Sequence, residues 1–479
     1  MRRAVLIAGL FLYGLCVGTA RAQNLSLVRD DEIERAVSFY LTPLFEKAGL
    51  DAENLSVHLV KDDSINAFAA KGLHVFVHTG LLTRADDAQE IIAVLAHETG
   101  HTAGGHIVRM YENMKIARRS MLLSMILGAA TVAVGGGADT AIGAASGGFS
   151  SMRSVFAAYR RSEENAADQT AAALLLKTGH DFSGFETIMR KLQTQESLGQ
   201  TDDFALWRSH PAAKERLEAI LNQTRLTRPS PDLTRIAQEN ALFRRVKAKL
   251  SAFLSSPEKT RARYPETDES LPARYARAIA DYRAGLFKRA LEQTDALIAD
   301  YPDDPYFYEL KGQILFETGR AADAVAPYEK AVSLQSDAIL LRAGLVQALI
   351  ERDDADALRR ARKELTALEP IAAELPSIWR LKAIVHGRLG QKGLADCALA
   401  EYGLATGDLK LARTFAERAH DELNETDPAR LRAEDILFRL RETETKKKDG
   451  RNKITVLEKR FLFYDWGYLN HKKGKEYVA

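Results

Sequence analysis

The chain has 479 residues, of which 46% are hydrophobic and 28% are charged, and its formal net charge is +2 at pH 7. This composition is typical of a globular protein that is too long for a single core, so we expect two or three domains. The nearly balanced charge gives no basis for a nucleic-acid-binding face, and no nucleic-acid partner is expected.

The N-terminus has the pattern of an export signal. Arg2 and Arg3 precede an apolar stretch from Ala4 to Val17, and small residues follow at Thr19, Ala20 and Ala22. We predict a signal peptide over residues 1–22, cleaved after Ala22, and a soluble exported protein. The alternative is an uncleaved membrane anchor, which we favour less because the apolar stretch is shorter than the ~20 residues that span a bilayer.

The first part of the mature chain mixes helix and short strands. An amphipathic helix is expected from Asp30 to Ala48, because apolar residues recur at helical spacing and Gly49 follows. Strands are expected at Leu55–Val60, Ile65–Ala70 and His74–His78, where β-branched and aromatic residues lie between turn residues. A second helix is expected after Asp86 and Asp87, and its apolar face continues into a cluster of metal-binding residue types.

That cluster is His97-Glu98-Thr99-Gly100-His101, which has the spacing H-E-x-x-H. Residues four apart lie on one face of a helix, so the two imidazoles can bind one metal ion while Glu98 points toward a metal-bound water. We predict one Zn²⁺ per chain, bound by His97 and His101, with Glu98 as the general base of peptide hydrolysis. Two surface histidines on an ordinary helix are the alternative.

A zinc site of this kind needs a third protein ligand, and the segment 161–168 offers carboxylates. Glu164 fits best, because Asp168 lies one helical turn further on and can accept the second ring N–H of a ligating histidine. Glu163 is the rival ligand. The alternative for the whole cluster is a solvated helix face.

These motifs together resemble the gluzincin family of CAAX prenyl proteases and HtpX-like membrane-quality proteases, over about Asp30 to Leu221. The family shares H-E-x-x-H followed by E-x-x-A-D, here Glu164 to Asp168. Similar segments are Asn66-Ala67-Phe68-Ala69, Thr79-Gly80-Leu81-Leu82 and Ser209-His210-Pro211, with Arg216 six residues after the histidine.

The resemblance implies that His210 and Arg216 lie at the active site. Two roles remain open for His210: a latch that occupies the fourth zinc position, or, together with Arg216, a donor that stabilises the oxyanion. Arg216 has a further alternative, which is to pair with Asp168 beside the metal ligands. The strand His74–His78 is a candidate for aligning an extended substrate by edge pairing, unless the protein itself covers that edge.

The apolar stretch 121–134 and the Gly- and Ala-rich residues up to 148 have three interpretations. They form a buried helix with a flexible loop, a lid over the cleft, or a peripheral membrane contact. Fourteen residues are few for a membrane span, so burial or a lid is favoured.

A repeat begins near Pro272. Turn positions at Gly285, Gly319 and Asp353 are 34 residues apart, and Gly390 follows after 37. Small or apolar residues recur at fixed offsets from each turn, which is typical of tetratricopeptide-like helix pairs. Such pairs stack into a superhelix whose concave face suits extended chains or partner proteins.

The predicted fold class is α+β: a mostly helical zinc-metalloprotease domain with a small β-sheet, followed by an all-α tetratricopeptide-repeat superhelix. The expected ranges are 1–22 signal peptide, 23–225 protease, 226–270 linker with a helix, 271–425 repeats, and 426–479 C-terminal helix and basic tail. By resemblance, we expect a periplasmic endopeptidase of a Gram-negative bacterium that acts in outer-membrane protein quality control. Its partners would be protein or peptide substrates and, through the repeats, outer-membrane assembly machinery; the alternative is a non-catalytic holdase or scaffold.

Overall fold

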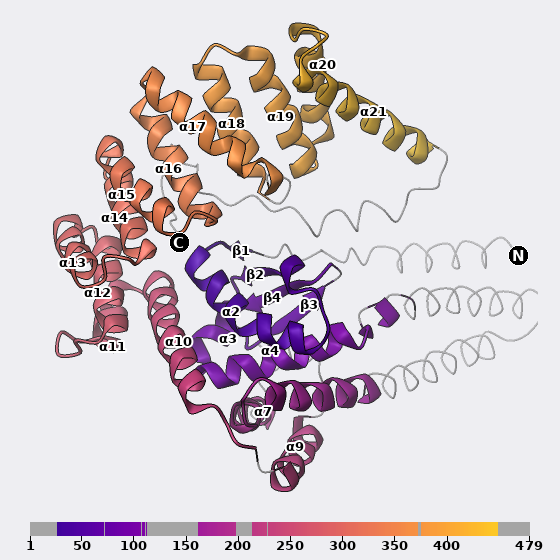
Figure 1. The fold of residues 1–479 in the computed structure, drawn as a ribbon, viewed down its shortest axis with the longest axis vertical. Helices are drawn as coiled ribbons and strands as arrows, with labels where there is room; N and C mark the ends of the chain where they lie inside the picture. Colours follow the sequence, from indigo (N-terminus) through magenta and orange to yellow (C-terminus); the bar gives the residue numbers. More distant parts are fainter. Residues whose placement is uncertain are drawn as a thin grey trace, which may run out of the picture.

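The computed structural model describes residues 26–70, 72–106, 108–110, 112, 161–197, 213–227, 229–371 and 375–448. These ranges are mostly helical with one small sheet, and the helices after residue 256 run in an arc past the N-terminal region (Figure 1), which confirms the α+β class. The predicted signal peptide, the stretch 121–148, His210 and the tail beyond residue 448 lie outside the described residues. None of the described helices is long and apolar enough to cross a membrane.

The sheet has the strand order β1-β2-β4-β3, with β1 (Leu27–Val28), β2 (Ser56–Val60), β3 (Ala67–Ala70) and β4 (His74–His78). Strand β4 runs parallel to β2 and antiparallel to β3, so it is paired along both sides. The expectation that His74–His78 aligns a substrate as an edge strand is therefore wrong. Among the described strands the outer position next to β4 belongs to β3, which follows β2 in sequence but not in space.

Helices pack against the sheet and against one another, and one of them carries the H-E-x-x-H motif into the core. They are α2 (Asp31–Lys47), α3 (Thr79–Arg84), α4 (Ala88–Ala103), residues 161–177, α7 (Ser183–Ser197) and α9 (Ala213–Thr227). Helix α4 begins after Asp87, whose side chain accepts a hydrogen bond from the Glu90 amide. Every residue of α4 from Ala88 to His101 is buried, so this helix is packed on all sides.

Helix α10 (Leu233–Leu254) belongs to two cores at once. Phe243, Val246 and Leu250 lie in the core of the N-terminal region, whereas Ala248 and Ala252 lie in the first core of the repeats. Figure 1 shows α10 between the two regions. The segment 226–270, predicted as a linker, thus contributes a helix that both regions share.

Near its N-terminal end, α10 also holds the start of α4. The Asn240 side-chain carbonyl accepts a hydrogen bond from the Ala88 amide at 2.8 Å, and Gln89 donates to buried Glu239 at 3.1 Å. His180 contacts the same Glu239 carboxylate at 3.0 Å. The first turn of the motif helix is therefore fixed by polar contacts as well as by apolar packing.

The repeats follow as antiparallel helix pairs. The helices are α11 (Pro257–Arg263), α12 (Leu271–Arg283), α13 (Phe287–Asp300), α14 (Pro305–Glu317), α15 (Ala321–Leu334), α16 (Ile339–Arg352), α17 (Ala355–Leu368), α18 (Pro376–Arg388), α19 (Lys392–Thr406), α20 (Leu409–Glu422) and α21 (Pro428–Lys448). The predicted turn residues Gly285, Gly319, Asp353 and Gly390 each separate two helices of a pair, and all four have positive φ. The tetratricopeptide prediction is confirmed, and Asp353 shows that the turn does not require glycine.

Charged side chains are buried where α2, α10 and the first repeats meet. Glu32 is 3% exposed and accepts hydrogen bonds from Arg245 and, at 3.0 Å, from the Tyr275 hydroxyl. Lys249 lies 2.8 Å from Asp30 and 3.2 Å from Glu32. We call Asp30, Glu32, Arg245, Lys249 and Tyr275 the junction cluster. It joins the N-terminal region to α10 through ion pairs and to the first repeats through the Tyr275 hydroxyl.

Candidate metal centre

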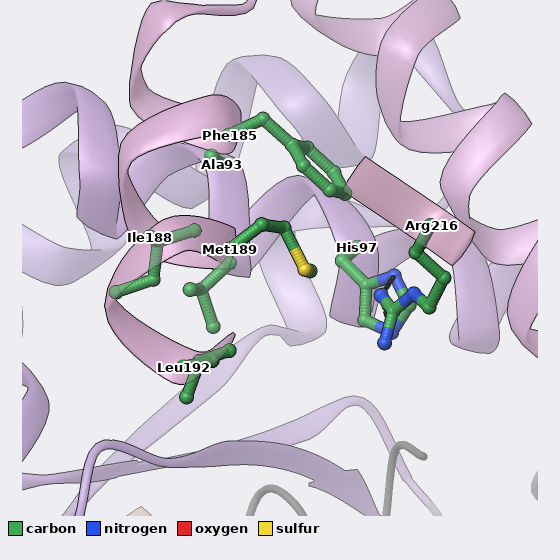
Figure 2. A pocket seen from close by; sticks show the side chains of 8 residues that line it. Ala93, His97, Phe185, Ile188, Met189, Leu192 and Arg216 are labelled. Atoms are coloured by element: carbon green, nitrogen blue, oxygen red, sulfur yellow. Dashed lines mark hydrogen bonds between the residues drawn. The ribbon is translucent and has the colours of Figure 1, made fainter. Parts of the chain in front are cut away.

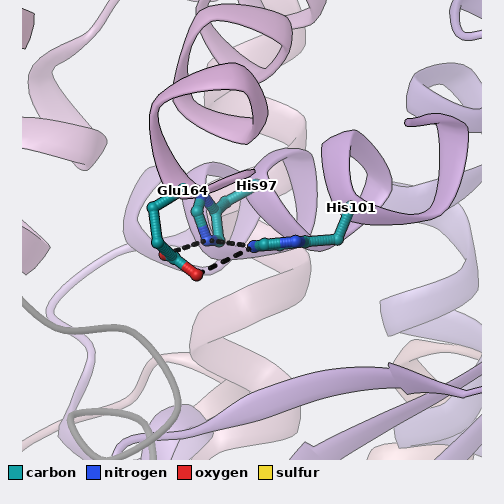
Figure 3. A group of neighbouring side chains, drawn as sticks. All are labelled: His97, His101 and Glu164. Carbon is teal, nitrogen blue, oxygen red and sulfur yellow. Dashed lines mark hydrogen bonds and ion pairs between the residues drawn. The ribbon is translucent and has the colours of Figure 1, made fainter. Parts of the chain in front are cut away.

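Helix α4 and residues 161–177 bring three metal-binding side chains together (Figure 3). The Nε2 atoms of His97 and His101 are 3.0 Å apart. The Glu164 carboxylate lies 3.4 Å from His97 Nε2 and 3.5 Å from His101 Nε2. All three residues are buried, and they form the single group of metal-binding type found among the described residues. His101 and Glu164 are 63 positions apart in the sequence, yet their side chains lie next to each other in the structure.

The geometry and chemistry of this group fit zinc. Two imidazole nitrogens and one carboxylate oxygen are common zinc ligands, and zinc sites with three protein ligands are catalytic rather than structural. Ligand atoms at about 2.0–2.1 Å from a tetrahedral ion lie roughly 3.3 Å from one another. The observed separations of 3.0 to 3.5 Å match that spacing.

Asp168 and Arg216 support His97 from its other side. The Nδ1 atom of His97 lies 2.9 Å from the Asp168 carboxylate, and Arg216 donates two hydrogen bonds of 2.7 Å to the same carboxylate. Arg216 also lies 3.2 Å from Glu164. A carboxylate at Nδ1 fixes the histidine tautomer that leaves Nε2 available to a metal.

The pKa values in this cluster show how strongly it stabilises positive charge. Burial and the Arg216 guanidinium oppose protonation of His97, but hydrogen bonds with Asp168 and Glu164 outweigh them and raise the pKa of His97 to about 9. Burial opposes ionisation of Asp168, but Arg216 and His97 outweigh it and lower the pKa of Asp168 to about 2. The same field that holds a proton on His97 would attract a metal cation.

Glu98 points from α4 toward the sheet. Its Oε2 atom accepts a hydrogen bond of 3.3 Å from the backbone amide of Ala69 in β3, and its side chain is buried. The next turn contains Gly100, where an added Cβ would lie 2.7 Å from the carbonyl oxygen of Ala167. Glycine at this position lets residues 161–177 approach α4 closely enough for Glu164 to reach the histidines.

The two adjacent carboxylates predicted as rival ligands have different neighbours. Glu164 faces His97 and His101, whereas Glu163 lies 3.1 Å from His106 and pairs with Arg109. Glu163 is therefore directed away from the three-residue group. Helical geometry separates the side chains of consecutive residues by about 100°, so both could not face one ion.

The structure leaves parts of the predicted site undescribed and adds others. His210 lies outside the described residues, and its role as latch or oxyanion donor stays a prediction. Arg216 makes the contact with Asp168 that was its alternative assignment.

Sequence reasoning missed His106, whose Nδ1 atom is 2.9 Å from that of His101, and the apolar side chains of α7 beside His97 (Figure 2). An H-E-x-x-H-x-x-x-x-H spacing was the available signal for His106.

Comparison with known proteins agrees with this geometry. Residues 29–224 match the family model of peptidase family M48, and residues 275–339 match a tetratricopeptide repeat model. Residues 29–224 form a peptidase family M48 domain. The matched range contains α2, strands β2, β3 and β4, helix α4, Glu164 and most of α9, so it includes every described residue of the candidate metal centre.

Several proteases are similar to this chain. The β-barrel assembly-enhancing protease of Yersinia pestis is 26% identical over 369 residues, which cover 74% of this chain and 72% of that protein. The protein of the same name from Escherichia coli K12 is 24% identical over 59% of this chain and 58% of its own length. Metalloprotease LoiP of E. coli is 29% identical over 35% of this chain and 61% of its own.

A solved structure of yeast Tom70 aligns with 62% of this chain and 63% of its own, at 16% identity. Its TM-score of 0.28 is too low to indicate a shared fold.

Proposed function

We propose that this protein is a zinc-dependent endopeptidase of the Gram-negative periplasm that hydrolyses peptide bonds in misfolded or stalled envelope proteins. The observation that carries the proposal is the convergence of His97, His101 and Glu164 within hydrogen-bonding distances of one another, beside Glu98. The similarity to β-barrel assembly-enhancing proteases over both regions of the chain supports the envelope setting.

In this proposal His97, His101 and Glu164 hold one zinc ion. Zinc, when bound, supplies a Lewis acid that polarises the scissile carbonyl and acidifies water. Glu98 accepts the proton of the attacking water and returns it to the leaving amine, as a general base and then a general acid. Asp168 keeps His97 in the required orientation by accepting the Nδ1 proton, and Arg216 holds Asp168 in place.

Strand β3 supplies the surface on which an extended substrate would lie. The His78 amide bonds to the Asn66 carbonyl, and in an antiparallel ladder this pairing alternates, so the backbone groups of Ala67 and Ala69 point away from β4. The Ala69 amide is directed at Glu98, which places this side of β3 at the metal centre. Main-chain pairing there would position a peptide independently of its sequence.

The repeats would recruit substrates or assembly machinery at the outer membrane. Stacked helix pairs present extended surfaces to unfolded chains or partners, and the junction cluster ties the first repeats to the peptidase domain. Recruitment by repeats that are anchored to the catalytic domain would deliver clients to a fixed distance from the metal centre.

Removal and return of zinc tests the proposal. Zinc-loaded protein is expected to cleave an unfolded outer-membrane protein, to lose this activity in chelator, and to regain it with about one equivalent of zinc. In the same titration, Arg216→Ala is expected to bind zinc about 10- to 100-fold more weakly, because His97 loses its supporting contacts, whereas Arg190→Ala on the exposed side of α7 is the control. Client binding without cleavage by the zinc-loaded protein would favour a holdase instead.

A further inference from the structure

Helix α21 is the last described helix of the repeats and lies at one end of their arc (Figure 1). One side of it packs on α19 and α20, where Ala433, Ile436 and Leu440 are buried. The opposite side exposes Leu431 by 60% and Phe438 by 57%. The end of a repeat array is ordinarily polar, because no further repeat covers it. An exposed apolar side at this place therefore calls for an occupant.

Comparison with α14 shows what these two positions do inside the array. Helices α14 and α21 both begin with a proline that follows a capping aspartate. Counted from that proline, Leu431 corresponds to Tyr308, and Phe438 corresponds to Leu315. In α14 both side chains pack against α15, the second helix of the repeat: Leu315 is 4% exposed, and Tyr308 packs on the cluster that contains Ala331. Helix α21 thus has the contact residues of a first helix, but no described helix covers them.

The exposed side of α21 is also acidic. Glu434, Asp435 and Glu442 each lie three or four residues from one of the two exposed apolar side chains, and residues at this spacing share a helix face. The side chains of Glu434 and Asp435 are about half exposed, and Glu442 is exposed. An occupant of this side should therefore combine apolar side chains with positive charge.

The chain that follows α21 has both properties. The helix is described up to Lys448, and the next two residues, Asp449 and Gly450, are typical of a turn. Residues 451–468 then contain four basic and two acidic side chains. Some of their apolar side chains recur at steps of three and four residues, which is the spacing of one helix face. This face comprises Ile454, Leu457, Phe461, Tyr464 and Tyr468.

Positions along the chain match the two apolar faces to each other. Two antiparallel helices joined by a short loop bring together residues that are equally far from the loop. Phe438 and Phe461 are each eleven residues from the Asp-Gly pair. Leu431 and Tyr468 are each eighteen residues from it. By the same count, the basic pair Lys459-Arg460 falls level with the stretch of α21 between Asp435 and Glu442.

We propose that residues 451–468 fold back on α21 as an antiparallel helix and cap the end of the repeats. The apolar face of this segment covers Leu431 and Phe438, and its basic residues face the acidic side chains of α21. The array then ends in a polar surface and does not associate end to end. No residue of the candidate metal centre takes part, so the cap stands or falls independently of the peptidase function.

A second copy of the chain is a poorer occupant for two reasons. A short loop keeps the segment 451–468 at an effective concentration on the order of mM beside α21, which a separate molecule does not reach at ordinary protein concentrations. In addition, two α21 helices that met through their exposed sides would bring like charges together, because each side is acidic.

Photo-crosslinking of the full chain tests the contact. Benzoylphenylalanine is placed at position Phe438, and the purified protein is irradiated and its cross-links are mapped by mass spectrometry. We expect cross-links within one chain to residues 451–468. The same probe at Phe287, an exposed phenylalanine of α13, should give none to this segment. Cross-links from Phe438 only to a second chain, or none to residues 451–468, overturn the proposal.

Hydrogen exchange measures whether the contact stabilises α21. In the double variant Leu457→Ser, Phe461→Ser, the amides of α21 should exchange at least about 10-fold faster than in wild type, because the helix loses its cover. The amides of α14 should exchange at the same rate in both proteins. Tyr477→Ser, which lies beyond the segment, is the control and should match wild type. Equal exchange of α21 in wild type and the double variant overturns the proposal even where cross-links form.

Discussion

Glu98→Gln is expected to lower peptidase turnover by about 10²- to 10⁴-fold while the protein keeps its zinc, because the carboxamide cannot accept the proton of the attacking water. Glutamine has the same shape and can still accept the hydrogen bond from the Ala69 amide, so the change alters the chemistry and not the packing. Turnover on a fluorogenic peptide and zinc content by elemental analysis are measured on the same preparation.

The matched control for this variant is Glu90→Gln. Glu90 is also buried on α4, but it pairs with Lys191 on α7 and lies outside the metal centre. This change should lower stability without lowering turnover per folded molecule. Undiminished turnover in Glu98→Gln would remove Glu98 from the reaction, and loss of zinc from it would mean that its side chain is needed to form the site.

The second large effect concerns stability. Glu32→Ala is expected to lower the free energy of unfolding by about 3–5 kcal/mol, because it removes a buried carboxylate from the junction cluster and leaves Arg245 and Lys249 buried with fewer partners. Denaturant unfolding followed by circular dichroism gives this value. Glu186→Ala, which breaks an exposed ion pair with Arg190 on α7, should cost at most about 1 kcal/mol.

The effect of Glu32 should also depend on pH. Burial opposes its ionisation, but Arg245 and Lys249 outweigh burial and hold the pKa of Glu32 below its ordinary value of 4.5. A carboxylate with a lowered folded-state pKa stabilises the fold above its unfolded pKa and loses this contribution as pH falls through the folded value. The stability difference between wild type and Glu32→Gln should therefore be largest above about pH 5 and shrink in acid. A constant difference down to pH 3 would show that the charge is not responsible.

Much of the geometry of the candidate metal centre was predictable because its determinants are local or periodic. The spacing of His97 and His101 places both on one face of any helix. Glu164 and Asp168 are also four residues apart, so the candidate metal ligand and the carboxylate that contacts His97 share one helix face. The structure places these side chains within 3.5 Å of their expected neighbours. The helix-pair turns at Gly285 and Gly319 were predictable for the same reason, since a left-handed turn residue recurs at a fixed period.

Features that depend on long-range packing were not predictable from this sequence. The order of strands in a sheet depends on contacts between distant parts of the chain, and β3 and β4 both look like short apolar strands in the sequence. The sequence analysis therefore assigned the edge position to β4, whereas β3 occupies it. Likewise, Glu32 and Lys249 look like residues of solvated helix faces, and only their burial at the contact between α2 and α10 reveals a junction. The α7 side chains beside His97 have the pattern of an ordinary core-facing helix.

Zinc content and cleavage in two neighbouring variants test the central claim most directly. Glu164→Ala and Glu163→Ala remove carboxylates that are adjacent in sequence, yet only Glu164 faces His97 and His101. We predict that Glu163→Ala keeps one zinc per chain and cleaves peptide, whereas Glu164→Ala loses most of its zinc and its activity. Full zinc and undiminished cleavage in Glu164→Ala, or loss of both in Glu163→Ala alone, would contradict the proposed metal centre.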